Sequence, residues 1–355
     1  MDKEQKKKRS GKRIALIVLC VVLSLVLVAG IGLTVALNWA FGLIGKPDNT
    51  PMSSDDIHQD IIKNTDPVDP DFTGPELHPD DIWTTGPTQT TPEQTTPGQT
   101  VPSQNEKNVI NIMLIGQDRR PGEGRCRSDA MILCSICLED KTLVMTSFQR
   151  DTYVQYPEGY SDHKLNSAYQ WGGMPLLDET LEMNYGIHID GNIEVDFNRF
   201  VQIIDLLGGV DISLTQAEAD WLSLGGNTIS PGAQHLDGKM ALAYARIRKI
   251  DNDFGRTNRQ RKVIISLLNS CKGSSMTTLT NLVKEILPII ATDMSEKEIM
   301  NLAMDLIPIL KDLEITSQSI PAKGTYTDAR VKGMYVLIPD LEANRALLRE
   351  TIYGE

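Results

Sequence analysis

VINIMLIGQDRRPGEGRCRSDAMILCSICLEDKTLVMTSFQRD, residues 109–151, contains three apolar runs separated by polar segments. The runs cover residues 109–118, Ala130–Leu138 and Thr142–Phe148. Their lengths and apolar content are typical of buried β-strands. The charged pair Glu139 and Asp140 joins the last two runs, which predicts a hairpin. The first run ends in Gly116 and an acidic residue, which suggests a functional site at that end of the strand.

Downstream of these runs, helical and strand-like segments alternate, as is typical of an α/β domain. Helices are predicted over Met174–Tyr185, Phe197–Leu207, Leu236–Ala245, 256–270, Met276–Ala291 and Glu296–Leu310, strands over His188–Phe197 and 210–214, and a final strand and capping helix at the end. The fold class is therefore α/β. We expect residues 108–355 to form a single extracytoplasmic α-β-α domain, with a central mixed sheet flanked by helices, behind one N-terminal transmembrane helix.

The membrane prediction rests on residues Ile14–Leu37, a run of 24 residues without a charge. At about 1.5 Å per residue this run reaches roughly 36 Å, enough to cross a bilayer with some tilt. The basic tail at residues 1–13 predicts a cytoplasmic N-terminus. A cleaved signal peptide is the alternative, but its apolar region usually has only about 7 to 15 residues. We therefore expect a single-pass cell-membrane protein anchored by residues 14–38.

Residues 39–107 differ in composition from the segments on either side. Acidic residues concentrate between Asp48 and Asp81, and a Thr/Pro-rich stretch with few aliphatic residues follows. Such a composition does not support a core, so it predicts a hydrated spacer that lifts the domain off the membrane. The formal net charge of the chain, -12, comes partly from this segment and does not define the partners of the domain.

The cysteines outside the predicted anchor do not form a recognisable metal motif. Cys134 and Cys137 lie three apart in a strand-like run, so they face opposite sides and cannot share a zinc ion. Buried packing is the simpler role for them, and a disulfide that involves Cys126 remains open.

Nine polar residues between positions 118 and 260 indicate an anion-binding site. They are Asp118, Arg127, Asp129, Arg150, Asp151, Arg246, Arg248, Arg256 and Gln260. Several flank apolar runs, where an unpaired charge costs several kcal/mol, so each is expected to have a fixed partner. A phosphorylated ligand with a divalent metal ion would supply such partners.

Spacing supports the same site. Arg246 and Arg248 project to one side if the chain is extended there. Arg256 and Gln260 share one face near the start of a helix, where free amides and the helix dipole favour anions. Each part also has a simpler interpretation: a local Arg150–Asp151 ion pair, or solvated surface arginines and a turn-capping aspartate elsewhere.

Seven short motifs occur in order along the chain. They are NIMLIGQD, GRCRSDAMIL, SFQRDTYV, KLNSAYQWGG, VDFNRFVQIIDLLGGVDI, HLDGKMALAYARIRK and DFGRTNRQ. With these motifs, the basic tail, the single span and residues 108–355, the chain resembles the LytR-CpsA-Psr family of membrane-anchored cell-wall glycopolymer ligases. The resemblance implies transfer of a glycopolymer from a polyprenyl pyrophosphate carrier to a peptidoglycan hydroxyl. A phosphodiester would form and polyprenyl phosphate would be released.

The resemblance also implies roles for the nine residues. Asp118 and Asp129 would hold Mg²⁺, with Mn²⁺ as the alternative, because hard oxygen ligands suit both ions. The arginines Arg127, Arg150, Arg246, Arg248 and Arg256 would clamp the pyrophosphate, Gln260 would add a hydrogen bond, and Arg150 and Arg246 would also act in catalysis. Charge-assisted bonds of this kind contribute about 1.5 to 3 kcal/mol each.

Some assignments remain open within this resemblance. Asp151 would accept the proton of the acceptor hydroxyl or orient an arginine, and Asp253 is a second candidate for the base. The usual family sequence is preceded here by an extra Gly-Arg-Cys, with Arg119, Arg120 and Arg125 nearby. These arginines compete with Arg127, which keeps the Arg-Ser-Asp spacing. Arg199, Arg259 and Arg261 are expected at the surface or behind the clamp.

The partners implied are a polyprenyl-pyrophosphate-linked glycan, peptidoglycan and membrane lipid, with no nucleic acid. The lipid tail requires an apolar pocket beside the arginines. Phe148, Phe197, Phe200 and Trp171 are candidates for its wall, although ordinary core packing is the simpler role for each. One alternative function uses the same site, a hydrolase of lipid phosphates or pyrophosphates. A second, suggested by the short basic cytoplasmic tail, is a non-enzymatic membrane regulator of the cell envelope.

Overall fold

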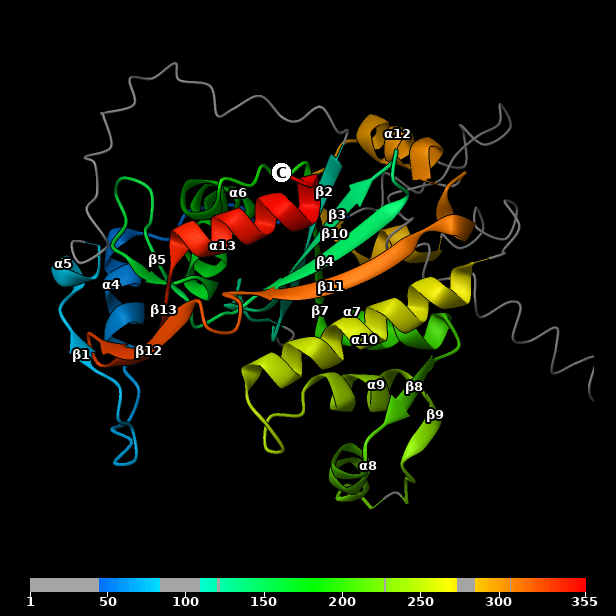
Figure 1. The fold of residues 1–355 in the computed structure, drawn as a ribbon, viewed down its shortest axis with the longest axis horizontal. Coiled ribbons are helices and arrows are strands. Elements are labelled where there is room, and N and C mark those ends of the chain that lie inside the picture. Colours follow the sequence, from blue (N-terminus) through cyan, green and yellow to red (C-terminus); the bar gives the residue numbers. More distant parts are fainter. Residues whose placement is uncertain (1–44, 84–108, 120–121, 227, 273–284, 307) are drawn as a thin grey trace, which may run out of the picture.

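The computed structural model describes residues 45–83, 109–119, 122–226, 228–272, 285–306 and 308–355. These residues form an α/β domain in which helices flank a mixed central sheet (Figure 1). The predicted anchor at residues 14–38 lies outside the described residues. Among the helices of the described ranges, none combines the length and the apolar character that crossing a membrane requires.

The central sheet has six strands in the order β10-β7-β2-β3-β4-β11. Their bounds are β2 Val109–Gln117, β3 Ser128–Cys137, β4 Thr142–Phe148, β7 Gly191–Asp196, β10 Ala291–Thr292 and β11 Glu314–Ile320. β2, β3 and β4 pair antiparallel, β7 and β11 add in parallel beside β2 and β4, and β10 closes one edge antiparallel to β7. The predicted strands at the start of the domain and the β3–β4 hairpin are confirmed.

The alternation of side chains along these strands places helices on both faces of the sheet. Ile112 and Ile132 belong to one core cluster, together with residues of α7 Phe197–Leu206, α8 Gln216–Ser223, α9 Gly238–Ala245, α10 Asp253–Cys271 and α12 Glu296–Leu306. Met113 and Leu133 belong to the opposite cluster, which includes residues of α6 Asn166–Tyr185 and α13 Leu341–Leu348 (Figure 1). The β8 Val210–Leu214 and β9 Gly232–Leu236 hairpin packs with the first group of helices.

Two helix predictions were wrong at their starts. α6 begins at Asn166 rather than Met174, and it contains a break at Gly173 (φ 71°, ψ -156°). The helical period of the sequence is therefore recognisable only after Gly173, which is where the predicted helix began. α10 begins at Asp253 rather than Arg256, because the Asn252 side chain accepts a hydrogen bond from Gly255 N and caps the helix three residues earlier.

Toward the end of the chain, the predicted helices proved shorter. Residues 273–284 lie outside the described ranges, and the described remainder of the predicted Met276–Ala291 helix is largely the 3₁₀ turn Leu287–Ile289 followed by β10. α12 ends at Leu306 rather than Leu310. Before α13 the chain forms two strands instead of one, β12 Tyr326–Val331 and β13 Met334–Pro339, which pair as a hairpin.

Residues 45–83, which we call the strap, lie against the domain although the sequence predicts a hydrated spacer over residues 39–107. The strap contains α4 Ser54–Lys63, β1 Glu76–Leu77 and α5 Pro79–Ile82, and β1 adds to the edge of β12 in parallel (Figure 1). Ile57 and Ile61 form an apolar stripe on α4, one turn apart, that packs on the α6 side of the core. This stripe cannot be recognised from composition, because acidic residues surround it in the sequence.

The strap also explains why residue 173 is glycine. A Cβ at Gly173 would lie 2.5 Å from Asn49 Oδ1 and 2.9 Å from Asn49 Cα, and the backbone dihedrals there are accessible mainly to glycine. Asn49 Oδ1 accepts a hydrogen bond from Met174 N at 3.2 Å, which ties the strap to the break in α6.

We predict that Gly173→Ala lowers the free energy of unfolding by about 2 to 4 kcal/mol, because backbone strain and the clash with the strap add. Gly186→Ala is the matched control: Gly186 has a similar φ of 69° but open space around its Cβ position, and it should cost about 1 kcal/mol. Urea denaturation of both variants measures the difference. Equal losses of unfolding free energy in the two variants would show that the strap does not restrict the residue at position 173.

Candidate functional site

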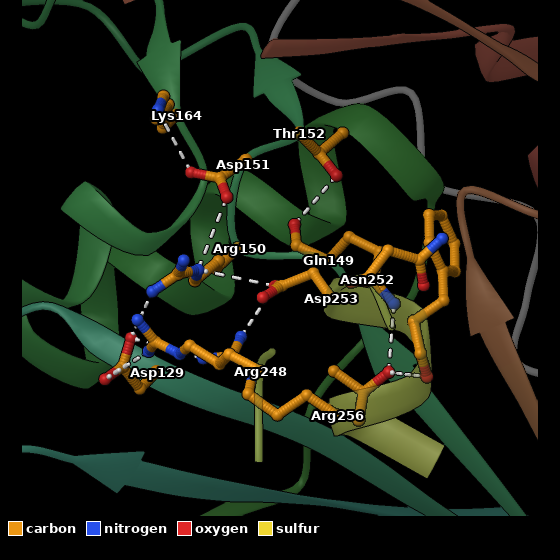
Figure 2. Close-up of polar contacts among 12 residues, drawn as sticks. Asp129, Gln149, Arg150, Asp151, Thr152, Lys164, Arg248, Asn252, Asp253 and Arg256 are labelled. Carbon is orange, nitrogen blue, oxygen red and sulfur yellow. Dashed lines mark hydrogen bonds and ion pairs between the residues drawn. The ribbon is translucent and has the colours of Figure 1, made fainter. Parts of the chain in front are cut away.

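Most of the polar residues singled out from the sequence meet where five segments converge. Asp118 follows β2, Asp129 lies near the start of β3, and Arg150 and Asp151 follow β4. The turn after α9 and the first turn of α10 supply Arg246, Arg248, Asp253 and Arg256. We use the term charge network for Lys164, Asp151, Arg150, Asp253, Arg256, Asp129 and Arg248, in which basic and acidic groups alternate (Figure 2).

Asp129 lies among three arginines. Its carboxylate is 2.8 Å from Arg150 Nη1, 3.3 Å from Arg248 Nη2 and 3.7 Å from Arg256 Nη1. Burial by itself raises the pKa of Asp129, but Arg150, Arg256 and Arg248 outweigh burial, and the pKa lies below its ordinary value. Asp129 is therefore a carboxylate at neutral pH.

Arg150 contacts three carboxylates at once. Its Nε lies 3.3 Å from both Asp151 Oδ2 and Asp253 Oδ2, in addition to the contact with Asp129. Burial lowers the pKa of Arg150, yet Asp151, Asp253 and Asp129 together raise it above its ordinary value. The local Arg150–Asp151 ion pair considered from the sequence therefore exists, but as one link in the charge network (Figure 2).

Arg256 is the most buried arginine of the charge network, with 1% of its surface exposed. It is held by Asp253 at 2.6 Å within the first turn of α10. Burial lowers the pKa of Arg256, and the carboxylates of Asp253 and Asp129 counteract that effect. A guanidinium remains charged in proteins, so the helix start carries a fixed positive charge in addition to its dipole.

Arg246 and Arg248 are the exposed arginines of the site, with about half of each side chain accessible (50% and 49%). Arg246 lies 3.3 Å from Asp118 and stacks on the Phe197 ring with its Cζ 4.2 Å from the ring centre. The extended backbone that would place both arginines on one side is not formed at Arg246, whose φ of -103° and ψ of 2° belong to the C-cap of α9. Both side chains nevertheless reach the ends of the paired strands β2 and β3.

Arg259 fixes the segment that carries these two arginines. It is 2% exposed, forks onto Asp251 with two contacts of 2.7 Å, and donates to Ile247 O at 2.6 Å. Arg259 was expected either at the surface or behind the arginines that would clamp the ligand, and the structure shows that it is buried. Arg261 is also buried and donates to the Ser319 hydroxyl at 3.0 Å, and burial lowers its pKa to about 10.

Arg127 and Gln260 lie apart from the charge network. Arg127 is bound by Asp60 of the strap at 2.8 Å and by Gln170, so these contacts attach the strap to the domain, and its role in the clamp stays a prediction. Arg125 donates to the Asp48 and Thr50 carbonyls of the strap. Gln260 lines a cavity, and its buried Oε1 has no hydrogen-bond partner within the described residues.

Lys164 belongs to the charge network but was missed from the sequence. It is 7% exposed and lies 3.1 Å from both Asp151 Oδ1 and Asp66 Oδ2. The available signal was its position in KLNSAYQWGG: a lysine directly before apolar and small residues is buried only when carboxylates compensate its charge.

An apolar cavity opens beside the exposed arginines. It encloses about 950 Å³ of space, including the part open to solvent, between the sheet and helices α7, α9 and α10. Its polar rim includes Arg246 and Gln260, and Phe197 and Phe200 form part of its wall, as suggested from the sequence. The other two aromatic candidates, Phe148 and Trp171, belong to the core cluster on the α6 face.

Two carboxylates could contribute to a metal site here. Asp118 and Asp129 follow or begin the paired strands β2 and β3, and each carboxylate already faces an arginine. Across the described ranges, no group of three or more His, Cys, Asp and Glu side chains could hold a metal. The donor set fits Mg²⁺, because this ion retains water and is commonly bound by one or two carboxylates plus substrate phosphates.

Three cysteines of the domain are thiols. Cys126, Cys134 and Cys137 are free, and burial raises the pKa of Cys134 to about 12. Cys134 and Cys137 are both buried on β3, as expected from their spacing.

We predict that Arg259→Lys lowers the free energy of unfolding by about 2 kcal/mol, because an ammonium cannot reproduce the fork onto Asp251 and the bond to Ile247. Amide hydrogen exchange at residues 246–251 should accelerate. Arg199→Lys is the control, since Arg199 is 30% exposed at its side chain and contacts Asp196 at 3.4 Å; it should change stability by less than about 0.5 kcal/mol. Unchanged exchange in Arg259→Lys would remove Arg259 from this role.

Comparison with known proteins places this geometry in a family. TagU of Oceanobacillus iheyensis, a polyisoprenyl-teichoic acid–peptidoglycan teichoic acid transferase, is 35% identical over 250 residues, 68% of this chain and 74% of TagU. Among solved structures, Bacillus subtilis TagV matches with a TM-score of 0.58 and 29% identity, covering 70% of this chain and 98% of TagV. TagT bound to LIIa-WTA matches with a TM-score of 0.56 and 26% identity, covering 70% and 92%.

The family model itself extends over most of the chain. The LytR_cpsA_psr family matches residues 83–351, which include every residue of the charge network and exclude nearly all of the strap. The chain therefore belongs to the LytR-CpsA-Psr family.

Proposed function

We propose that this protein transfers a glycopolymer from a polyprenyl pyrophosphate to a hydroxyl of peptidoglycan. The observation that carries the proposal is an apolar cavity whose rim bears an exposed arginine, Arg246, next to the charge network. A ligand with a long apolar tail and a pyrophosphate head has both features. Teichoic acid, the polymer in the name of the related TagU, is the polymer we assign to this chain.

The reaction exchanges one phosphorus–oxygen bond for another. The acceptor hydroxyl oxygen forms a bond to the polymer-linked phosphorus, and the bond from that phosphorus to the bridging oxygen breaks. Polyprenyl phosphate leaves with the bridging oxygen and the bonding electrons, and the hydroxyl proton passes to a base or to water. Fixed positive charges lower the barrier when they stabilise the charge that moves onto the leaving group. Arg246 and Arg248 are exposed and can turn from their aspartates toward that charge.

Asp151 orients the charge network in this proposal. Lys164 binds one of its carboxylate oxygens and Arg150 binds the other. Neither oxygen can reach an acceptor hydroxyl without leaving its present partner, so the geometry favours the orienting role over the general base. Arg150 and Arg256 are less exposed, and they then act as fixed positive charges behind the exposed Arg246 and Arg248.

The polyprenyl carrier also sets the location that we propose. A lipid-linked donor reaches the cavity only if the domain lies next to a membrane, and a peptidoglycan acceptor is found outside the cell membrane. We therefore propose an anchor at residues 14–38 with the domain on the outer side, as the basic tail and uncharged run predict.

We predict that the purified full-length chain joins lipid-linked polymer to peptidoglycan, with the product measured as polymer sedimenting with the wall. Arg248→Ala should lower the rate about 100-fold, because it removes an exposed charge on the pyrophosphate. Arg330→Ala, which removes a remote arginine paired with Glu76, should retain activity. A hydrolase would instead release free polymer without an acceptor, a non-enzymatic regulator would join no polymer, and an unchanged rate in Arg248→Ala would contradict the role of Arg248.

We propose Mg²⁺ as the cofactor, held by Asp118 and Asp129 together with pyrophosphate oxygens, where it would neutralise charge on the phosphates. Chelation with EDTA should abolish transfer, and added Mg²⁺ should restore it. Mn²⁺ is expected to substitute, because it accepts the same oxygen ligands. Full activity in EDTA would contradict a metal role for these two aspartates.

A further inference from the structure

The strap supplies one carboxylate to the charge network from outside the segment that matches the family. We propose that Asp66 is a positioning residue, which holds Lys164 against Asp151 and so orients Arg150. The proposal rests on the transfer activity proposed above. Asp66 lies on the strap between α4 and β1, and the family match begins at residue 83.

Asp66 is itself fixed by the β12–β13 hairpin. Its backbone N donates to Gly333 O at 3.0 Å, and its Oδ2 accepts a hydrogen bond from Tyr335 N at 2.8 Å. These two bonds set both the main chain and the carboxylate of Asp66. The carboxylate therefore reaches Lys164 from a defined direction.

Lys164 connects Asp66 to Asp151. Its Nζ lies 3.1 Å from each of the two carboxylates. Lys164 pairs with Tyr153 between the short strands β6 His163–Lys164 and β5 Tyr153–Val154. Leu337 N, on the same strand as Tyr335, donates to Asp151 O at 3.0 Å, so β13 aligns both aspartates.

The burial of Lys164 makes its carboxylate partners necessary. An ammonium that is 7% exposed requires compensation for lost hydration, and two carboxylates provide it here. Lysine has a flexible four-carbon stem, so its head group moves easily when a partner is lost. Without the Asp66 charge, Lys164 is held by Asp151 alone and is no longer confined to one position.

A merely structural role for Asp66 would resemble that of the other ion pairs of the strap. Asp60 binds Arg127 at 2.8 Å and Glu76 lies 3.4 Å from Arg330. Neither pair includes a member of the charge network. Among the ion pairs formed by the described strap residues, the pair from Asp66 to Lys164 reaches the network. Substitutions can therefore distinguish a positioning role of Asp66 from a purely structural one.

The test compares Asp66→Asn, Asp66→Glu and the control Glu76→Gln in the full-length chain. In the transfer assay, Asp66→Asn should lower kcat about tenfold with KM within about twofold, because a displaced group affects orientation more than binding. Asp66→Glu should recover activity to within about threefold of the wild type, because it restores the charge. Glu76→Gln, which loosens a strap contact elsewhere, should leave kcat unchanged.

A second readout does not depend on activity. Acylation of Lys164 by acetic anhydride, followed by peptide mass spectrometry, should be several-fold faster in Asp66→Asn than in the wild type or Glu76→Gln, since Lys164 is less confined. Equal losses of kcat in Asp66→Asn and Glu76→Gln, or unchanged acylation of Lys164 in Asp66→Asn, would overturn the proposal. If the wild type transfers no polymer, the proposed function fails, while acylation still decides whether Asp66 confines Lys164.

Discussion

The mutual repulsion of the clustered arginines is the constraint on which the site depends. Arg150, Arg248 and Arg256 all approach one carboxylate, Asp129, within 3.7 Å. Two unit charges about 4 Å apart repel by about 4 kcal/mol at the effective dielectric constant of a protein surface. Asp129 and Asp253 lie between the arginines and offset this repulsion. The deeper arginines, Arg150 and Arg256, can therefore be held in place before any ligand binds, so that the proposed pyrophosphate would meet two charges that are already positioned.

The fold meets this constraint by holding the arginines at different depths. The deep members of the network are fixed by the end of the sheet and the start of α10, while Arg246 and Arg248 extend from a turn that Arg259 anchors from inside. The same turn borders the apolar cavity. The arrangement couples charge recognition to apolar recognition, since movement of the turn changes both the exposed arginines and the rim of the cavity.

Much of this domain could be predicted from local sequence. Apolar runs with a charged turn identified β2, β3 and β4, and motif order brought Asp129, Arg150 and Arg248 into one hypothesis. The strap could not be predicted, because its short apolar stripe is buried only through tertiary contacts. Lys164 and Arg127 show the same limit: their partners, Asp66 and Asp60, lie 98 and 67 residues away in sequence, and spacing gives no information about such pairs.

The central claim is that one ligand spans the exposed arginines and the apolar cavity. The most direct measurement is the affinity for farnesyl pyrophosphate and for inorganic pyrophosphate, in the wild type and in Ile264→Trp, which fills the cavity from α10. The wild type should bind the prenyl ligand at least about 100-fold more tightly, because its tail is buried. Ile264→Trp should lose most of this preference and keep its affinity for inorganic pyrophosphate. Equal affinities of the wild type for both ligands, or an unchanged preference in Ile264→Trp, would contradict the claim.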